Sequence, residues 1–452
     1  MKVIIVGAGK IGLTIIKSLI SEKHEVTVID NNSEVVEKLN NSYDIIAICG
    51  NGTSYNVLND AKISKADLLI ACTSLDELNM LVCYLGRKLG AKNTIARIRS
   101  VEQNEESVKF ISTQLELSLS INPELSTAKD LCNILKLPSA IKVETFSSAQ
   151  LEMYEISIKS NLQITEIPLI ELRKKFQLDF LVCLIERNGK VFIPNGYDVL
   201  KDGDKIGVIS PKEDTTKLLK YMNMLEKQAK NVIIVGASKT AYYLCKLLEK
   251  SNINVKVIDK NESRCEEIRR VLSNNATVIF GDGMSQDLLN EEGISSCDCF
   301  ISLTNKDEQN ILMSLYATNK KVKTVITKIN REELWDVAKS LGLERIISPK
   351  QQVADIVVKY ARSLDNLDGC NIEMLFSLMD GKAEALEFRV SSNFKKVNIP
   401  IKDLKIKAGI LIAGIIRNKE VIIPTGNDVI LLDDEVVVIT SSKKLYDLTE
   451  IL

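Results

Sequence analysis

The stretch VIIVGAGKIG at residues 3–12 decides the fold of this chain, and it recurs as VIIVGASKTA at residues 232–241. Each copy is an apolar run followed directly by a loop that contains glycine. Such a run is typical of a buried strand in a parallel sheet, and the loop has the spacing of a phosphate-binding turn. An internal repeat of this kind indicates a chain built from copies of one unit.

The repeat extends well beyond these two loops. The segment ADLLIACTSLDELNML at residues 66–81 matches CDCFISLTNKDEQNIL at residues 297–312. Farther along, VFIPNGYDVLKDGDKIGVIS at 191–210 matches VIIPTGNDVILLDDEVVVIT at 421–440. Because matched segments occur throughout each half, the whole half is duplicated and not only its loop.

Each half is expected to contain two domains. Short apolar runs at residues 3–6, 26–29, 45–48, 68–71 and 94–98 alternate with stretches of helical periodicity, which is typical of a doubly wound parallel sheet. Linking helices are predicted at 123–137 and 349–363. Strands at 151–158, 179–186, 190–193 and 205–209 and a helix at 168–176 then predict a small α+β domain, of a size that commonly pairs.

We therefore predict an α/β fold: a tandem duplication of a Rossmann-like nucleotide-binding domain followed by a small α+β domain. The expected boundaries are 1–138 and 229–368 for the nucleotide-binding domains, with their linking helices. Residues 139–228 and 369–452 are expected to form the small domains.

The first loop, GAGKIG, offers a site for a pyrophosphate. Gly7 permits a tight turn, Gly9 lets backbone N–H groups approach the phosphate, and Gly12 allows the following helix to pack close to the strand. The start of that helix adds unpaired donors and partial positive charge. Asp30 ends the second strand, where its carboxylate can accept from ribose hydroxyls and repel a 2′-phosphate. This pattern favours NAD(H), ATP or ADP over NADP.

The second loop departs from the glycine pattern. Gly236 and Asp259 are retained, but Ser238 and Ala241 stand at the second and third glycine positions. Ala241 is an accepted substitute, whereas Ser238 adds a side chain where the backbone should approach a phosphate. Two alternatives stay open for this site: a mononucleotide, or no ligand.

Further candidate ligands follow later strands, because open α/β sheets bind at the carboxyl ends of their strands. These residues are Asn51 and Asp282 after the third strand, Thr73, Ser74 and Thr304 after the fourth, and Arg97 and Lys328 on the fifth. A solvated loop end is the alternative for each of them taken singly.

The composition excludes several classes of protein. The chain has 452 residues, 45% of them hydrophobic, and a net charge of −1, so the charge does not favour nucleic-acid binding. Its ten cysteines are scattered without a CxxC pair and there is one histidine, which argues for a reducing, cytoplasmic compartment and against structural zinc. No apolar segment is long enough to span a membrane.

Catalysis is not expected. The single histidine, His24, is predicted at the surface, on the edge of the sheet opposite the loops. The pairs Tyr84/Lys88, Tyr242/Lys246 and Tyr316/Lys320 have the Tyr-x-x-x-Lys spacing of some dehydrogenases, but they lie on helices rich in apolar residues. An NAD-dependent oxidoreductase is the alternative hypothesis. A nucleotide-responsive repressor ranks last, since no basic stripe or helix-turn-helix is recognised.

Over essentially its whole length, the chain resembles the TrkA family, the cytosolic regulatory subunits of Trk potassium uptake systems, which consist of tandem RCK (KTN-type) units. The resemblance is carried by residues 7–12, Asp30, residues 66–81, Arg97 and residues 193–198, with their partners in the second half.

The resemblance implies a cytoplasmic homo-oligomer, a dimer or tetramer, that forms a ring beneath a membrane potassium-translocating subunit. NAD(H) is implied for the first site, ATP, ADP or AMP for either site, and cyclic di-AMP is a candidate for the small domains. No metal, nucleic acid or catalytic residue is implied. The implied first site is Gly7, Ala8, Gly9, Lys10, Ile11, Gly12, Asp30, Thr73, Ser74 and Arg97, and the second is Gly236, Ala237, Ser238, Lys239, Thr240, Asp259, Thr304 and Lys328.

Overall fold

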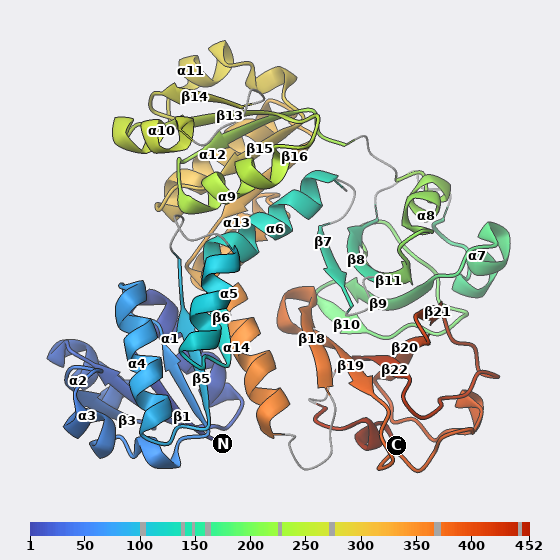
Figure 1. The fold of residues 1–452 in the computed structure, drawn as a ribbon. Helices are drawn as coiled ribbons and strands as arrows, with labels where there is room; N and C mark the ends of the chain where they lie inside the picture. The colour runs from blue at the N-terminus through green and yellow to red at the C-terminus, as the bar shows by residue number, and fades with distance from the viewer. Residues whose placement is uncertain are drawn as a thin grey trace. The chain divides into compact units, whose positions relative to one another are not determined.

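A computed structural model describes residues 1–99, 105–136, 141–146, 150–158, 164–224, 228–270, 276–365, 372–441 and 445–452. The chain divides into two compact units, each assembled from both halves of the sequence. The first unit is Met1–Leu131 with Lys230–Ala361, and the second is Cys132–Ala229 with Arg362–Leu452. Figure 1 shows both units along the chain.

The first unit contains two six-stranded parallel sheets. The first sheet has the order β3 (Ile46–Cys49), β2 (Glu25–Asp30), β1 (Lys2–Val6), β4 (Leu68–Ala71), β5 (Asn93–Arg97), β6 (Leu119–Ile121). Its helices are α1 (Lys10–Ser21), α2 (Ser33–Ser42), α3 (Tyr55–Asp60), α4 (Asp76–Lys88), α5 (Glu105–Gln114) and α6 (Pro123–Lys136). The strand order reverses between β1 and β4, which is where doubly wound sheets bind ligands.

The second sheet repeats the same order in the second half. It runs β14 (Ala276–Phe280), β13 (Asn254–Asp259), β12 (Asn231–Val235), β15 (Cys299–Ser302), β16 (Thr324–Lys328), β17 (Arg345–Ile347). Its helices are α9 (Lys239–Leu248), α10 (Glu262–Arg269), α11 (Gln286–Glu291), α12 (Asp307–Asn319), α13 (Trp335–Ser340) and α14 (Pro349–Asp365). The predicted strands are confirmed, and each sheet has a short sixth strand that the apolar runs did not indicate.

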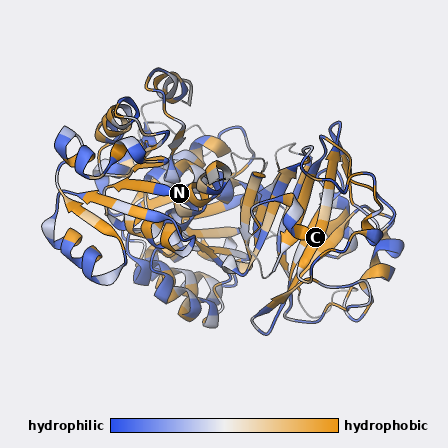
Figure 2. Cartoon of the chain, turned by 90° about the horizontal axis from the view of Figure 1, so that it is seen from below, coloured by the Kyte–Doolittle hydropathy of each residue, from blue (hydrophilic) through white to orange (hydrophobic). Residues whose placement is uncertain are grey.

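These strands form because their residues are apolar on both faces. Val3, Ile5 and Ile70 are almost fully buried between helices on either side of the first sheet. Figure 2 shows the strands as predominantly hydrophobic ribbons. The described helices include none that is both long and apolar enough to cross a bilayer.

The second unit contains two five-stranded antiparallel sheets. One has the order β10 (Lys190–Phe192), β9 (Leu181–Arg187), β11 (Lys205–Pro211), β8 (Leu151–Ser157), β7 (Lys142–Thr145), with helices α7 (Leu169–Phe176) and α8 (Thr215–Tyr221). The other runs β18 (Ile372–Leu378), β19 (Ala383–Arg389), β22 (Glu435–Thr440), β20 (Ile410–Arg417), β21 (Glu420–Ile422). The described helices of this second small domain are the short 3₁₀ turns Met379–Gly381, Ile401–Asp403 and Leu448–Ile451. The two antiparallel small domains complete the predicted fold class.

The two small domains share one hydrophobic core. The cluster contains Phe146, Met153 and Leu184 from the first and Ala385 and Ile439 from the second. Domains of this size bury little apolar surface alone, so joining their sheets gives each a fuller core. The predicted pairing of such modules occurs here within one chain.

Candidate functional site

The first loop has the backbone geometry that its glycines imply. Gly7 has φ +99°, and a Cβ on it would lie 3.0 Å from the Thr73 nitrogen. A Cβ on Gly12 would lie 2.0 Å from the Gly7 oxygen. Both positions therefore require glycine, one for its backbone conformation and one for the close packing of α1 on the loop.

Gly9 differs from both of these glycines. None of the described residues has an atom within 4 Å of where its Cβ would stand. It is also the N-cap of α1, and it has no side chain to pair with the first N–H groups of that helix. The loop therefore offers an open cradle with backbone donors, which fits the phosphates of a nucleotide.

Asp30 fixes the conformation of the first loop through hydrogen bonds to its backbone. Its Oδ2 accepts the Ala8 N–H at 2.7 Å and its Oδ1 accepts the Asn32 N–H at 2.9 Å. Asp259 does the same in the second half, with Ala237 at 2.6 Å and Asn261 at 2.8 Å. Since a carboxylate can accept about four hydrogen bonds, lone pairs remain for ribose hydroxyls in both halves.

A buried asparagine organises the carboxyl ends of strands four and five. Thr73 Oγ1 donates to Asn79 Oδ1 at 2.7 Å, and Asn79 Nδ2 donates to the Arg97 oxygen at 2.9 Å. Thr304, Asn310 and Lys328 repeat this arrangement at 2.6 and 2.9 Å. Sequence reasoning treated Asn79 and Asn310 only as repeat markers, whereas each holds two candidate ligands at fixed spacing.

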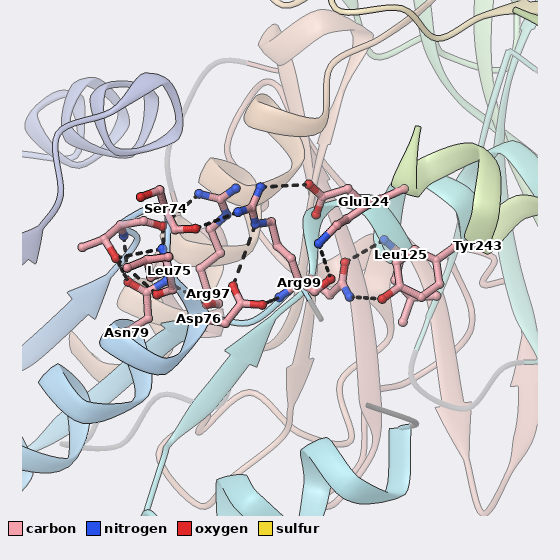
Figure 3. Close-up of polar contacts among 12 residues, drawn as sticks. Ser74, Leu75, Asp76, Asn79, Arg97, Arg99, Glu124, Leu125 and Tyr243 are labelled. Atoms are coloured by element: carbon pink, nitrogen blue, oxygen red, sulfur yellow. Dashed lines mark hydrogen bonds and ion pairs between the residues drawn. The ribbon is translucent and has the colours of Figure 1, made fainter. Parts of the chain in front are cut away.

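Arg97 lies among charged groups and not in open solvent (Figure 3). Its guanidinium donates to the Thr73 oxygen at 3.2 Å. The Arg99 guanidinium donates to the Ser74 oxygen at 2.8 Å, and its backbone N–H donates to Asp76 Oδ2 at 2.7 Å. Burial, followed by the charge of Arg99, lowers the pKa of Arg97. A phosphate beside Arg97 would therefore find a fixed cation.

A pocket in the second half brings together much of the second candidate site. Its lining includes Gly236, Ser238, Asp259, Asp282 and Thr304. Ala237 contributes only its backbone N–H to Asp259, and the Thr240 side chain is buried. Lys328 is also buried, and its Nζ donates at 3.2 Å to Oδ1 of Asn305, which lines the pocket.

The same pocket contains residues that sequence reasoning missed. Lys260, Arg264 and Lys306 line it, together with Gln309 and Met284. Lys260 directly follows Asp259, and Arg264 lies in the first turn of α10, which Asn261 caps. The sequence position of Lys260 could have indicated its place in the pocket, because the turn after the strand-ending acid faces the ligand crevice in this fold.

Elements of the two halves meet beside the loops within the first unit. Lys239, at the start of α9, donates from Nζ to the Arg99 oxygen at 3.3 Å. Asn122 Nδ2 donates to the Tyr243 hydroxyl at 2.9 Å (Figure 3). Lys328 lies in the field of Glu124 and of Lys10, while burial, the largest cause, lowers its pKa. The second loop and the end of β5 in the first half are thus in direct contact.

His24 and the pair Tyr84/Lys88, two of the groups considered for catalysis, lie away from the glycine loops. His24 is 9% exposed, so the prediction of a surface position is wrong: it lies in the turn between α1 and β2, with Nδ1 3.5 Å from the N-terminal amine. It lies at the amino edge of the sheet, as predicted. Lys88 Nζ lies 5.5 Å from the Tyr84 ring centre and pairs with Glu116, a surface arrangement and not a proton-transfer site.

Among the described residues, one group of three carboxylates has the proximity that a metal ion would need. Oxygens of Glu373, Glu387 and Glu435 lie within 4.8 Å of one another on β18, β19 and β22. Arg389 pairs with Glu373 at 3.7 Å. Acidic groups of this kind are common in proteins without a metal, and we assign no site to it.

Comparisons with known proteins agree with this geometry. The model of the TrkA-N domain matches residues 3–113 and 232–349, and that of the TrkA-C domain matches 153–223 and 385–452. The Trk system potassium uptake protein TrkA of Vibrio alginolyticus is 31% identical over 459 residues, covering 100% of this chain and 98% of that protein.

Solved structures show the same fold. The GsuK channel bound to NAD matches with a TM-score of 0.65 at 17% identity, over 98% of this chain and 77% of that one. GsuK bound to ADP matches with a TM-score of 0.51 at 16% identity, over 81% of this chain and 69% of that one.

Proposed function

We propose that this chain, which belongs to the TrkA family of Trk system potassium uptake proteins, is a nucleotide-sensing regulatory subunit that gates a membrane potassium-translocating protein. The observation that carries the proposal is the pair of loops at the switch points of two parallel sheets, each followed by a strand-ending acid. Both are built to receive an adenosine phosphate.

The first site is proposed for NAD(H). Gly9 leaves the cradle open, Asp30 faces the ribose, and the ends of strands four and five supply Thr73 and Arg97. NAD is bound in one structure of the GsuK channel, which has a similar fold. ATP, ADP or AMP share the adenosine phosphate that this site recognises and are candidates for either site. GsuK also binds ADP.

Gating would follow from unequal binding to two arrangements of the domains. A ligand shifts such an equilibrium only by its difference in affinity for the two arrangements. The contact between Lys239 and Arg99 gives a physical route, because it ties the second loop to the end of β5 in the first half. A nucleotide that displaces either group changes how the two halves pack.

The partner and the assembly follow the family. We infer a membrane potassium-translocating subunit as partner, a cytoplasmic position on its inner side, and a homo-oligomer, dimer or tetramer, that forms a ring. Even numbers of chains are expected where modules of different chains pair isologously, since such contacts close on themselves. Cyclic di-AMP at the small domains remains a candidate ligand for direct titration.

Calorimetric titration of the purified chain with NADH, NAD⁺, ATP, ADP and cyclic di-AMP tests the proposal. Saturable binding of NADH or ATP is expected. Asp30→Ala should weaken NADH binding at least about tenfold, because it removes the ribose acceptor and the tie to Ala8. Asp44→Ala, an exposed acid on the opposite sheet edge, is the control. If no adenine nucleotide binds, the sensor has no ligand and the proposal fails.

A regulatory role also requires that the nucleotide is not consumed. NADH incubated with the protein and a panel of carbonyl substrates should keep its absorbance at 340 nm over hours, apart from its decay in buffer. Steady loss that depends on protein and substrate would instead favour the NAD-dependent oxidoreductase. Potassium flux through the partner, measured with and without NADH, then tests gating directly.

A further inference from the structure

We propose that Lys260, Arg264 and Lys306 make the second pocket selective for ATP or ADP over the dinucleotide NAD(H). The inference rests on the proposed function, since it assigns a ligand class to one of its two sites. The duplication alone does not imply this selectivity, because the selectivity depends on the positions at which the two halves differ.

The first observation is a change of charge between equivalent positions. Lys260, Arg264 and Lys306 line the second pocket, where the first half has Asn31, Val35 and Leu75. Asp282 stands where the first half has Asn51, so the second pocket gains three cations and one carboxylate. Added positive charge favours the more highly charged of two competing anions, and ATP carries more negative charge than NAD(H).

These cations remain available for a ligand. Within the described part of the chain, Lys260, Arg264 and Lys306 are exposed and make no ion pair within 4.0 Å. Asp259 and Asp282, in contrast, are engaged by backbone N–H groups: Asp282 Oδ1 accepts from Met284 at 2.9 Å. The negative groups of the pocket are thus partly satisfied by the fold, and the positive ones are not.

The cations also have the right places for a mononucleotide. A ribose bound to Asp259 would lie on the β13 side of the switch point, and Arg264 lines the same pocket, where its guanidinium could stack on the face of an adenine. The rest of the ligand then extends over the ends of β15 and β16. Lys306 lines the pocket, and Lys328 donates to Asn305, which also lines it; two cations suit a phosphate chain better than a nicotinamide riboside.

The second observation concerns the loop itself. Ser238 is the N-cap of α9, and its Oγ accepts the Ala241 N–H at 3.3 Å. At the equivalent position Gly9 has no side chain, so the corresponding donor of α1 stays open to a ligand. The second loop therefore offers one donor fewer to a central pyrophosphate, and more of the binding must come from side-chain cations.

The test separates the two pockets by mutation. In Asp30→Ala the first site is weakened, so ATP should still bind while NADH binding is largely lost. Adding Lys260→Asn, Arg264→Val and Lys306→Leu, which installs the residues of the first half, should weaken ATP at least about tenfold. The salt dependence of ATP binding should fall with it, because fewer charges pair. Calorimetry at two ionic strengths measures both effects.

Matched variants keep the result interpretable. Because the three side chains are exposed, the variants should melt within about 2 °C of the parent, and Lys306→Leu alone gives a smaller loss in the same direction. The reciprocal change, Leu75→Lys in the first half, should improve ATP binding there.

Two outcomes would overturn the inference: unchanged ATP affinity in the triple variant, or NADH binding equal to that of ATP in Asp30→Ala. If the unmutated chain binds no adenine nucleotide, the proposed function itself fails. Binding by the unmutated chain with no effect of the triple change overturns only the assignment of the second pocket.

Discussion

At the scale of single residues, the three glycines of the first loop have three different roles. Gly7 provides a left-handed turn, Gly12 allows close packing, and Gly9 leaves space. Only the last of these roles concerns a ligand directly. These are the roles that the glycine pattern predicts, and the surroundings of each Cβ show that Gly7 and Gly12 are required for folding while Gly9 is not.

These different roles predict that one alanine substitution affects stability and the other affects nucleotide binding. Gly12→Ala should lower the free energy of unfolding by about 1–3 kcal/mol, because its Cβ would collide with the Gly7 oxygen. Gly9→Ala should leave stability nearly unchanged and weaken NADH binding several-fold, because its methyl group fills the cradle. Urea unfolding and calorimetry measure the two. Equal destabilisation by both changes would contradict this division of roles.

At the scale of elements, both small domains contain the same arginine–aspartate pair, which joins the end of one strand (β9 or β20) to the residue before another (β11 or β22). Arg187 makes two bonds to Asp204, at 2.8 and 2.7 Å, and Arg417 makes two to Asp434 at 2.9 and 2.7 Å. Both aspartates are only 1% exposed. Each arginine also donates to a carbonyl of the following loop, Val199 or Val429, at 2.8 Å. The pair fixes that loop against the end of the strand.

Removing either arginine should therefore destabilise the small domains to a similar extent. Arg187→Met and Arg417→Met are each expected to cost about 1–3 kcal/mol, because a buried carboxylate loses its ionic partner, while the partly exposed arginine limits the loss. Lys190→Met, an exposed change on β10, is the control. Chemical denaturation monitored by circular dichroism gives the values. A cost equal to that of the control would show that these pairs contribute nothing net.

At the scale of the whole molecule, the duplication brings matching modules together. The two small domains share a core in which Phe146 and Phe376 meet edge to face, with ring centres 5.3 Å apart. In the first unit the two TrkA-N domains and the segments that follow them contact each other through Asn122 and Tyr243 and through Thr127 and Gln352. Both units therefore contain parts of both halves.

The shared core predicts energetic coupling between the small domains. Phe146→Ala should cost about 3–5 kcal/mol, because the ring is almost fully buried. Combined with Phe376→Ala, the two losses should be less than additive by about 0.5–1.5 kcal/mol, the usual worth of an aromatic pair. A double-mutant cycle by equilibrium unfolding measures this term. Strict additivity would mean that the two rings do not interact in solution.

The sequence by itself determined the fold class and the position of the two glycine-containing loops. Apolar runs buried on both faces form parallel strands, and a glycine-containing loop that follows such a run is typical of a phosphate-binding turn. The internal repeat gives the same evidence a second time. These signals are local in the chain, so they can be read without knowing what packs against what. The structure has Gly7 and Gly236 at positive φ directly after a strand, and Asp30 and Asp259 accept from loop N–H groups; their role in binding stays a prediction.

The tertiary structure decided what depends on distant segments. Asn79 joins the ends of two strands, Lys239 contacts Arg99 from the other half, and His24 is buried, none of which has a local signature. Arg264 is an ordinary helix residue in the sequence and a pocket residue only because β13 and β15 bring their ends together. Contacts between segments far apart in the chain are set by packing, which a local pattern does not encode.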